Sequence, residues 1–140
     1  MLTIQNTGLV VVDIQGNLAH MVYESDTLIH NTLMLIKAAK VLELPIIYLE
    51  QAPLKLGKTV ITLSEELSPR SPITKHTFNA CAAPEFLDAL KQHTKQNWLV
   101  CGIEAHICVY QSVLGMLNLG YSVDVVCDAA SSRLAENKTL

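Results

Sequence analysis

The sequence predicts an α/β protein with a doubly wound, Rossmann-like, three-layer fold, in which helices cover both faces of a mostly parallel sheet. Short apolar runs alternate along the chain with segments of helical periodicity. Continuous apolar, β-branched runs are typical of parallel strands, because both faces of such a sheet are buried. A chain of 140 residues can bury one core, so we expect a single domain over residues 1–140.

Five runs are expected to be strands: Leu9–Val12, Pro45–Leu49, Ile73–Lys75, Trp98–Cys101 and Tyr121–Val126. Helices are expected over Asp26–Leu42, from Pro84 through Leu90, and from Cys108 towards the stop signal at Gly120. Prolines and a glycine punctuate residues 51–72, which are therefore expected to be a long irregular loop with one helical turn at Ser64–Leu67. Loops of this length often line a site.

Five residues with chemical or conformational significance stand at the ends of the expected strands: Asp13, Glu50, Lys75, Gly102 and Asp128. The carboxyl ends of parallel strands meet at one edge of the sheet, and ligands bind beyond that edge. We therefore expect these five residues to lie near a common site.

Composition narrows the classes of function. The net charge of −3 gives no electrostatic reason to expect nucleic acid or an anionic membrane as a partner. No apolar run reaches the roughly 18 residues of a membrane span, and the N-terminus does not resemble a secretory signal. The four cysteines lack paired spacing, which favours reduced thiols in a cytoplasmic protein. The histidines are scattered, so no metal or other cofactor is expected.

Cys108 is the candidate nucleophile, because a cysteine at the start of a helix meets unpaired N–H groups and the positive end of the helix dipole. Both effects lower a thiol pKa. Asp13 could accept the thiol proton, Lys75 could supply a positive charge, and N–H groups between Gly102 and Cys108 could hold an oxyanion. Such a trio suits acyl transfer from an amide.

The residues alone leave other interpretations open. Cys108 could be a small core residue, Asp13 could cap a turn, and Lys75 could be a solvated surface lysine. Cys101 and Cys127 are expected to be packing residues. His106, two positions before Cys108, is a rival base, and a redox role would pair Cys108 with Cys81.

Five segments resemble the isochorismatase-like cysteine hydrolases, and most closely the subgroup of isochorismatase domain-containing proteins. They are VVVDIQGNLA (Val10–Ala19), PIIYLEQAPLKLG (Pro45–Gly57), ITKHTFNAC (Ile73–Cys81), CGIEAHICVYQSV (Cys101–Val113) and DAASSRLAENK (Asp128–Lys138). The resemblance covers essentially the whole chain, and its specificity lies in the ordered set of motifs rather than in any one of them.

The resemblance implies a catalytic triad of Asp13, Lys75 and Cys108. It also implies a cis peptide bond between Ile103 and Glu104, which would turn the Glu104 N–H towards an oxyanion beside the Cys108 N–H. Leu18, Gln51 and Phe78 flank the triad motifs and are the expected substrate contacts. Members of the family are usually oligomers, so a homo-oligomer is expected.

The sequence differs from two branches of the family at residues that carry their chemistry, and these differences narrow the expected reaction. Nicotinamidases hold a metal through an Asp-x-His motif, where this chain has Glu50-Gln51-Ala52. True isochorismatases act on a vinyl ether and lack a cysteine at the position of Cys108. We therefore expect a metal-independent cysteine hydrolase that cleaves a C–N, amide-type bond of a small molecule through a thioester. The alternative is a catalytically silent binding or assembly module with the same fold.

The last ten residues look like the start of a helix with no strand after it. Family members continue there with a helix, a strand and a helix, so this form is expected to be C-terminally truncated. An edge strand would then be left for a partner subunit to cover.

Overall fold

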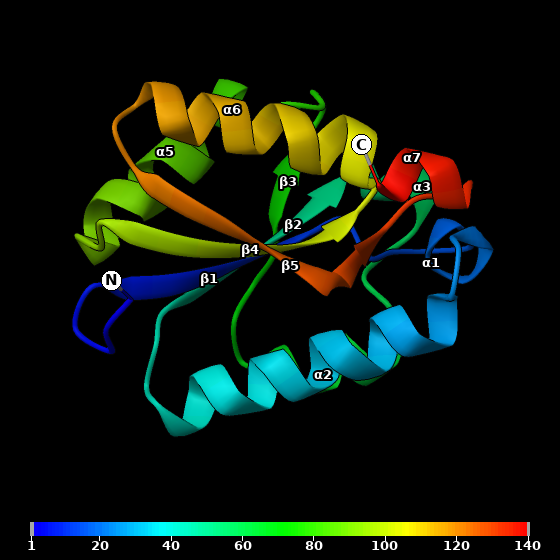
Figure 1. Cartoon of the computed structure of the whole chain (residues 1–140), viewed down its shortest axis with the longest axis horizontal. Coiled ribbons are helices and arrows are strands. Elements are labelled where there is room, and N and C mark those ends of the chain that lie inside the picture. The colour runs from blue at the N-terminus through cyan, green and yellow to red at the C-terminus, as the bar shows by residue number, and fades with distance from the viewer. Residues whose placement is uncertain (1, 140) are drawn as a thin grey trace.

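Five parallel strands form a sheet in the order β3-β2-β1-β4-β5 in the computed structural model, which describes residues 2–139 (Figure 1). The strands are β1 (Thr7–Val12), β2 (Ile46–Gln51), β3 (Ile73–Lys75), β4 (Asn97–Ile103) and β5 (Ser122–Ser131). The helices are α1 (Leu18–Met21), α2 (Ser25–Val41), α3 (Pro53–Leu56), α4 (Ile61–Leu67), α5 (Pro84–His93), α6 (Tyr110–Asn118) and α7 (Ala135–Lys138). A 3₁₀ turn spans Ala80–Ala82, and a π-helical turn spans Ala105–Val109.

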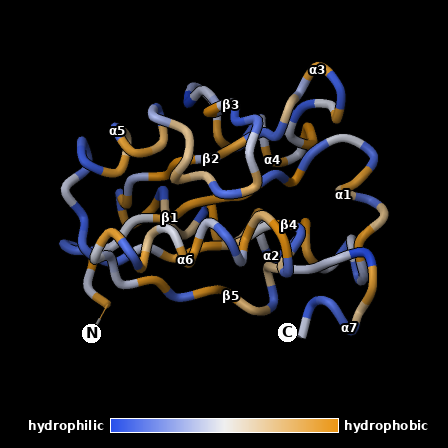
Figure 2. Tube along the Cα trace, turned by 90° about the horizontal axis from the view of Figure 1, so that it is seen from above, coloured by the Kyte–Doolittle hydropathy of each residue, from blue (hydrophilic) through white to orange (hydrophobic). Residues whose placement is uncertain are grey.

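The central strand is β1, whose six residues are all buried. Its apolar, β-branched side chains pack on both faces of the sheet, while its backbone pairs with β2 on one side and β4 on the other. Figure 2 shows hydrophobic residues along the inner strands and hydrophilic residues mainly in the outer loops and helices. The expected α/β fold is therefore confirmed, and the sheet is parallel throughout.

Helices cover both faces of the sheet and form the outer layers. In Figure 1, α5 and α6 lie on one face and α2 lies on the other, where α4 packs beside it. Ile36 of α2 and Leu63 of α4 share one core cluster, and Phe86 of α5 and Met116 of α6 belong to the other. In the described part of the chain, no helix is both long and apolar enough to cross a membrane.

Two segments differ from expectation. Residues 51–72 contain α3, which was not expected, and α4, which includes the expected turn at Ser64–Leu67 but begins three residues earlier, with Leu63 and Leu67 buried on the side that packs against α2. Strand β5 runs to Ser131, past the expected end at Val126, with an irregularity opposite the β4 residues Val100–Gly102. Asp128 therefore lies within the strand and is exposed, so its expected place at the site is wrong.

Candidate active site

A cavity of about 240 Å³ lies at the carboxyl ends of the strands, where the fold class predicts a site. Six of the seven expected site residues line it: Asp13, Leu18, Gln51, Phe78, Glu104 and Cys108. The seventh, Lys75, is completely buried and reaches the cavity wall through Asp13. The remaining lining residues are Gln15, Leu56, Ile103, Ile107 and Arg133.

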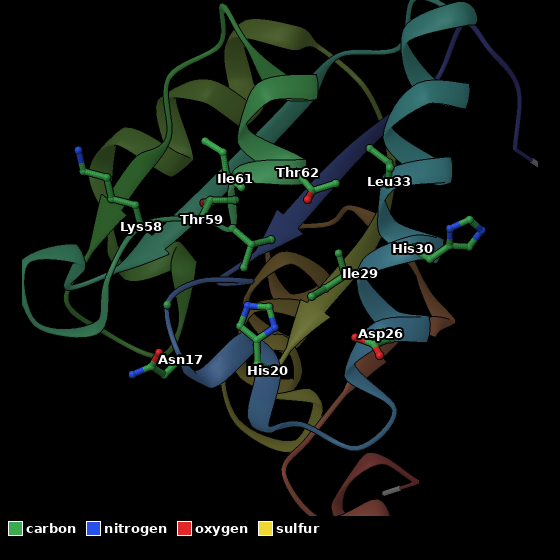
Figure 3. Close-up of a pocket in the computed structure, with 12 residues that line it drawn as sticks. Asn17, His20, Asp26, Ile29, His30, Leu33, Lys58, Thr59, Ile61 and Thr62 are labelled. Carbon is green, nitrogen blue, oxygen red and sulfur yellow. The ribbon is translucent and has the colours of Figure 1, made fainter.

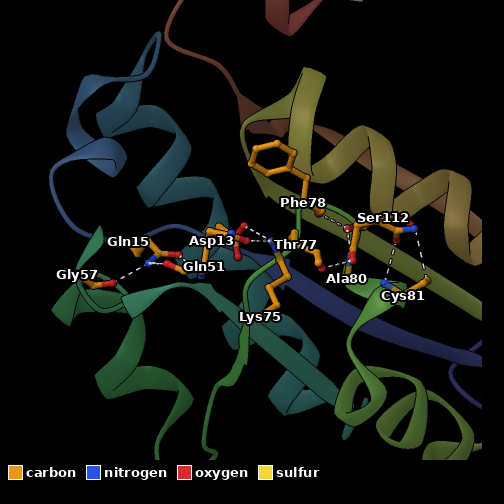
Figure 4. Close-up of polar contacts among 11 residues, drawn as sticks. Asp13, Gln15, Gln51, Gly57, Lys75, Thr77, Phe78, Ala80, Cys81 and Ser112 are labelled. Carbon is orange, nitrogen blue, oxygen red and sulfur yellow. Dashed lines mark hydrogen bonds and ion pairs between the residues drawn. The ribbon is translucent and has the colours of Figure 1, made fainter. Parts of the chain in front are cut away.

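Lys75 ends β3, and its ammonium group makes three hydrogen bonds inside the protein (Figure 4). It donates to Asp13 Oδ2 at 2.7 Å, to Gln51 Oε1 at 2.7 Å and to the Thr77 carbonyl at 3.0 Å. An ammonium has three N–H donors, so all of them have a partner. Lys75 therefore acts on the cavity through its positive charge.

Asp13 follows β1 with φ of 52°, a left-handed conformation that is uncommon for residues other than glycine. Its Oδ2 accepts the Lys75 bond, whereas its buried Oδ1 has no hydrogen-bond partner among the described residues. Burial raises the pKa of the Asp13 carboxyl, and Lys75 opposes that rise. A carboxyl oxygen without a partner is thus available at the cavity.

Cys108 lies in the π-helical turn before α6, two residues before the regular α-helix begins. Burial and the neighbouring charge of Asp13 raise the pKa of the Cys108 thiol to about 12, and the opposing effect of Lys75 is smaller. The expected lowering of this pKa is therefore wrong. The thiol is protonated at neutral pH and needs a base to become a nucleophile.

The peptide bond between Ile103 and Glu104 is cis, as the resemblance implied. Gly102, just before it, has φ of +131°, and a Cβ at that position would lie 2.1 Å from the Val12 carbonyl oxygen. Only glycine fits this close approach of β4 to β1. After the cis bond, the Glu104 carbonyl accepts hydrogen bonds from the Ile107 and Val109 N–H groups, which closes the turn that carries Cys108.

Gln15 is a buried site residue that the sequence did not single out. Its Nε2 donates to the carbonyls of Gln51 and Gly57, at 2.9 and 2.6 Å, and its Oε1 accepts from the Gln51 N–H at 2.7 Å (Figure 4). These bonds fix the backbone of Gln51, whose side chain binds Lys75. Gln51, expected to contact substrate, thus also holds the lysine in place.

The other residues expected near this edge have separate partners. Glu50 is buried, and its Oε2 accepts hydrogen bonds from the Thr59 N–H and hydroxyl, both at 2.8 Å. His106 Nδ1 lies 2.9 Å from Ser132 Oγ, and His106 does not line the cavity. Cys101 is buried as expected, but Cys127 is exposed, so its expected packing role is wrong.

Phe78 lines the cavity from the loop after β3, and about half of its surface is exposed. Ser112 of α6 holds that loop in place: its hydroxyl accepts from the Ala80 N–H at 2.9 Å and donates to the Phe78 carbonyl at 3.3 Å. Cys81, in the same loop, has its Sγ 4.0 Å from the Ser112 carbonyl oxygen and does not line the cavity.

A second cavity, of about 620 Å³, lies on the other side of the α1 connection (Figure 3). Its lining includes His20, Asp26, His30 and Lys58, but His30 and Lys58 point away from each other in Figure 3. Within residues 2–139, no group of three or more His, Cys, Asp or Glu side chains is arranged to hold a metal ion. The smaller cavity is therefore the one in which reactive groups converge.

The chain is similar in sequence to a known family and to several of its members. The isochorismatase domain family matches residues 7–140. The secreted isochorismatase effector Isc1 of Phytophthora sojae is 33% identical over 94% of this chain and 65% of its own length. Isochorismatase family protein 1A of Dictyostelium discoideum is 36% identical over 91% of this chain and 64% of its own length. The chain thus spans just under two thirds of these relatives.

Three solved structures each align with 99% of this chain. The structure described as MAR1 ribonuclease from Caenorhabditis elegans has a TM-score of 0.91 and 39% identity, with 71% of that chain covered. YcaC from Escherichia coli, described as an octameric hydrolase of unknown specificity, has a TM-score of 0.92 and 26% identity, with 70% covered. YcaC from Pseudomonas aeruginosa, solved with hexane-2,5-diol and covalent acrylamide, has a TM-score of 0.91, 26% identity and 70% coverage. With the family match over nearly the whole chain, these similarities show that the chain belongs to the isochorismatase family and has its hydrolase fold.

Proposed function

We propose that the protein is a metal-independent cysteine hydrolase that cleaves the C–N bond of a small amide through a thioester. The observation that carries this proposal is the Asp13 carboxyl. One of its oxygens is bound to the buried Lys75, and the other has no partner among the described residues, in the cavity that Cys108 also lines. The carboxyl is thus placed to accept the thiol proton that the raised pKa of Cys108 retains.

The first half of the reaction forms the thioester. Asp13 takes the proton from Cys108, and the sulfur attacks the amide carbonyl carbon to give a tetrahedral oxyanion. Asp13 then gives its proton to the nitrogen, the C–N bond breaks, and ammonia or an amine leaves.

The second half of the reaction restores the enzyme. Asp13 takes a proton from water, the hydroxide attacks the thioester carbonyl, and the C–S bond breaks. The sulfur regains a proton, and a carboxylic acid is released.

Backbone N–H groups of Glu104 and Cys108 are proposed to hold the oxyanion. The Ile107 and Val109 N–H groups donate to the Glu104 carbonyl, whereas the Glu104 N–H has no loop or cap acceptor in the described part of the chain. Donors already in place can stabilise a developing charge without reorganisation. Lys75 supports both halves of the reaction because its charge stabilises the Asp13 carboxylate and the thiolate.

The size of the cavity and the net charge of −3 favour a small molecule over a nucleic acid as substrate. The covalent acrylamide in the P. aeruginosa neighbour is consistent with a reactive nucleophile and a pocket for a small amide in proteins of this fold. The octameric E. coli neighbour supports a homo-oligomer. Four free cysteines support a reducing, cytoplasmic location, although one relative is named a secreted effector.

The test is ammonia release from a panel of small primary amides, followed with wild-type protein and Cys108→Ser, Asp13→Asn and Lys75→Met variants. We expect each variant to lose activity, with Cys108→Ser at least roughly a thousandfold slower. Mass spectrometry after acid quenching should find the acyl group on Cys108. Cys127→Ser is the matched control and should be fully active. Unchanged turnover in Cys108→Ser would overturn the proposal, and release from no amide would favour the binding or assembly module.

Activity should also fall in acid. Asp13 accepts a proton only when it is ionised, and burial raises the pKa of its carboxyl. The acid limb of the rate profile should therefore lie above the ordinary pKa of about 3.9 for an aspartate. Measuring the initial rate of ammonia release against pH locates this limb. A limb at or below the ordinary value would contradict the assignment of Asp13 as the base.

A further inference from the structure

Arg133 follows β5 and is the one cation among the described residues that line the catalytic cavity. Its backbone N–H and its Nε both donate to Glu104 Oε1, at 3.1 and 3.3 Å. Glu104 is buried, so it holds the inner edge of the guanidinium group in a fixed position at the cavity wall. Arg133 is therefore oriented by the same residue that follows the cis peptide bond.

The guanidinium group has donors to spare. It carries five N–H donors, of which only the Nε–H has a partner among the described residues. The side chain is 56% exposed, so both Nη groups remain accessible. Two parallel N–H groups match the two oxygens of a carboxylate, and this bidentate pairing is stronger and more specific than a neutral hydrogen bond.

The rest of the described cavity lining offers no other cation with unused donors for an anion. Asp13 and Lys75 neutralise each other, and five of the other lining residues are apolar: Leu18, Leu56, Phe78, Ile103 and Ile107. Glu104 is already engaged through Oε1 with Arg133. A substrate that lies along the apolar wall with its amide at Cys108 would therefore meet a cation with unused donors only at Arg133, since the other unused side-chain donor in the described lining is the neutral amide of Gln51.

We propose that Arg133 selects the substrate by binding a carboxylate at the end opposite the scissile amide. The substrates are then small amides of monoanionic character, such as the half-amide of a short dicarboxylic acid, and neutral amides of the same shape are poor substrates. This inference rests on the proposed function of Cys108 as nucleophile, and it adds the chemical class of the substrate and the residue that recognises it.

A pair of thiol reagents tests the charge preference without knowledge of the natural substrate. Iodoacetate and iodoacetamide have nearly the same shape, and both alkylate sulfur by forming an S–CH₂ bond as the C–I bond breaks and iodide leaves, but only iodoacetate carries a negative charge. The ratio of their rates is measured at Cys108 and, in the same sample, at the exposed Cys127, by peptide mass spectrometry at pH 9. Cys127 supplies the ratio for a thiol outside the cavity.

The iodoacetate preference of a thiol is its rate of alkylation by iodoacetate divided by its rate with iodoacetamide. In wild type, we expect this preference to be larger at Cys108 than at Cys127. Arg133→Gln should reduce the preference at Cys108 by roughly tenfold to a hundredfold, the range for one charge-assisted hydrogen-bonded contact. Arg133→Lys should keep part of it. Arg70→Gln is the matched control, because Arg70 lines a different cavity, beside Lys40 and Glu43, and should change nothing. The same ratio at Cys108 in wild type and Arg133→Gln would overturn the inference.

Turnover separates this inference from the function on which it rests. Succinamate and succinamide differ only in replacing one carboxylate with an amide, and release of ammonia is followed for both. Faster hydrolysis of succinamate, lost in Arg133→Gln, supports the inference. Equal hydrolysis of both overturns the charge preference but leaves the cysteine hydrolase standing. Hydrolysis of neither, with Cys108 unlabelled by both reagents, overturns the hydrolase and the inference together.

Discussion

The two halves of the candidate site are built in different ways. The charge half follows β1, β2 and β3 and consists of Asp13, Gln15, Gln51 and Lys75, which are joined by short hydrogen bonds and shielded from solvent. The thiol half follows β4 and β5 and consists of residues 102–108 with Arg133. It is shaped by backbone conformation and by a half-exposed arginine. Hydrogen bonds between side chains thus position the charged groups, whereas the backbone conformation of residues 102–108 positions the nucleophile.

Of the substitutions that test the difference between the two halves, Lys75→Met should cause the largest loss of stability. It removes the counter-ion of a buried carboxyl, and loss of one partner of a buried pair costs about 3–5 kcal/mol. Urea unfolding measures the loss. Arg133→Gln should cost less, because the guanidinium of the thiol half is half-exposed and the Arg133 backbone N–H still binds the buried Glu104 carboxylate. The double variant Asp13→Asn/Lys75→Met should recover part of the stability but no activity. Similar losses for Lys75→Met and Arg133→Gln would refute the contrast.

Gln15→Met tests the hydrogen bonds of the charge half that do not involve the Asp13–Lys75 ion pair. The change keeps the volume and leaves the N–H of Gln51 and the carbonyls of Gln51 and Gly57 without their partner. We expect a loss of about 3 kcal/mol in the free energy of unfolding, since each buried unsatisfied group costs about 1–3 kcal/mol. Gln111→Met, on the exposed face of α6, is the matched control and should be neutral. A neutral Gln15→Met would mean that the loop repacks without the amide.

Ser112→Ala tests how the thiol half is joined to the loop that carries Phe78. Two hydrogen bonds to the backbone of Phe78 and Ala80 are lost, which should cost about 1–2 kcal/mol. Because Phe78 lines the cavity, KM for a small amide should rise more than kcat falls. The exposed Ser122→Ala serves as control. A fall in kcat alone would contradict a role in shaping the pocket.

Alkaline pH should also lower the stability of the folded chain. Burial raises the pKa of Cys101 to about 12, against 9.0 for an ordinary thiol. Between these values the unfolded chain has lost a proton that the folded chain keeps, so stability falls as pH rises. The contribution of this thiol is at most about 1.4 kcal/mol per pH unit. Urea unfolding between pH 8 and 10.5 should show a flatter decline for Cys101→Ala than for wild type.

The sequence predicts the strands well where both faces are buried. β1 and β3 appear where the apolar runs indicate, because continuous burial leaves a continuous apolar pattern. The end of β5 was misjudged because its first seven residues are all exposed or half-buried, so the polar Asp128 was interpreted as the end of the strand rather than as part of a solvent-facing strand. The seven-residue α4 was predicted only in part, because its first turn depends on the packing of Leu63, which local periodicity cannot indicate.

At the site, the sequence predicts which motifs meet but not how they interact. Asp13, Glu104 and Cys108 line one cavity with Lys75 behind it, in keeping with strand ends that share one edge. The sign of the Cys108 pKa shift was missed because it depends on burial and on Asp13, 95 positions away in the chain, rather than on the local turn. Gln15 and Arg133 carry weaker signals: a polar residue just past a buried strand, and a lone arginine just past β5.

The position of β1 at the centre of the sheet has a consequence for synthesis. Thr7 pairs with Asn97, so roughly ninety residues must be made before β1 can meet β4. At roughly 5–20 residues per second, the apolar run of β1 stays half-paired for several seconds as the chain emerges. During that interval, β2 is the one neighbouring strand that can shield it. A nascent chain of this protein should therefore depend on chaperones until β4 has been translated.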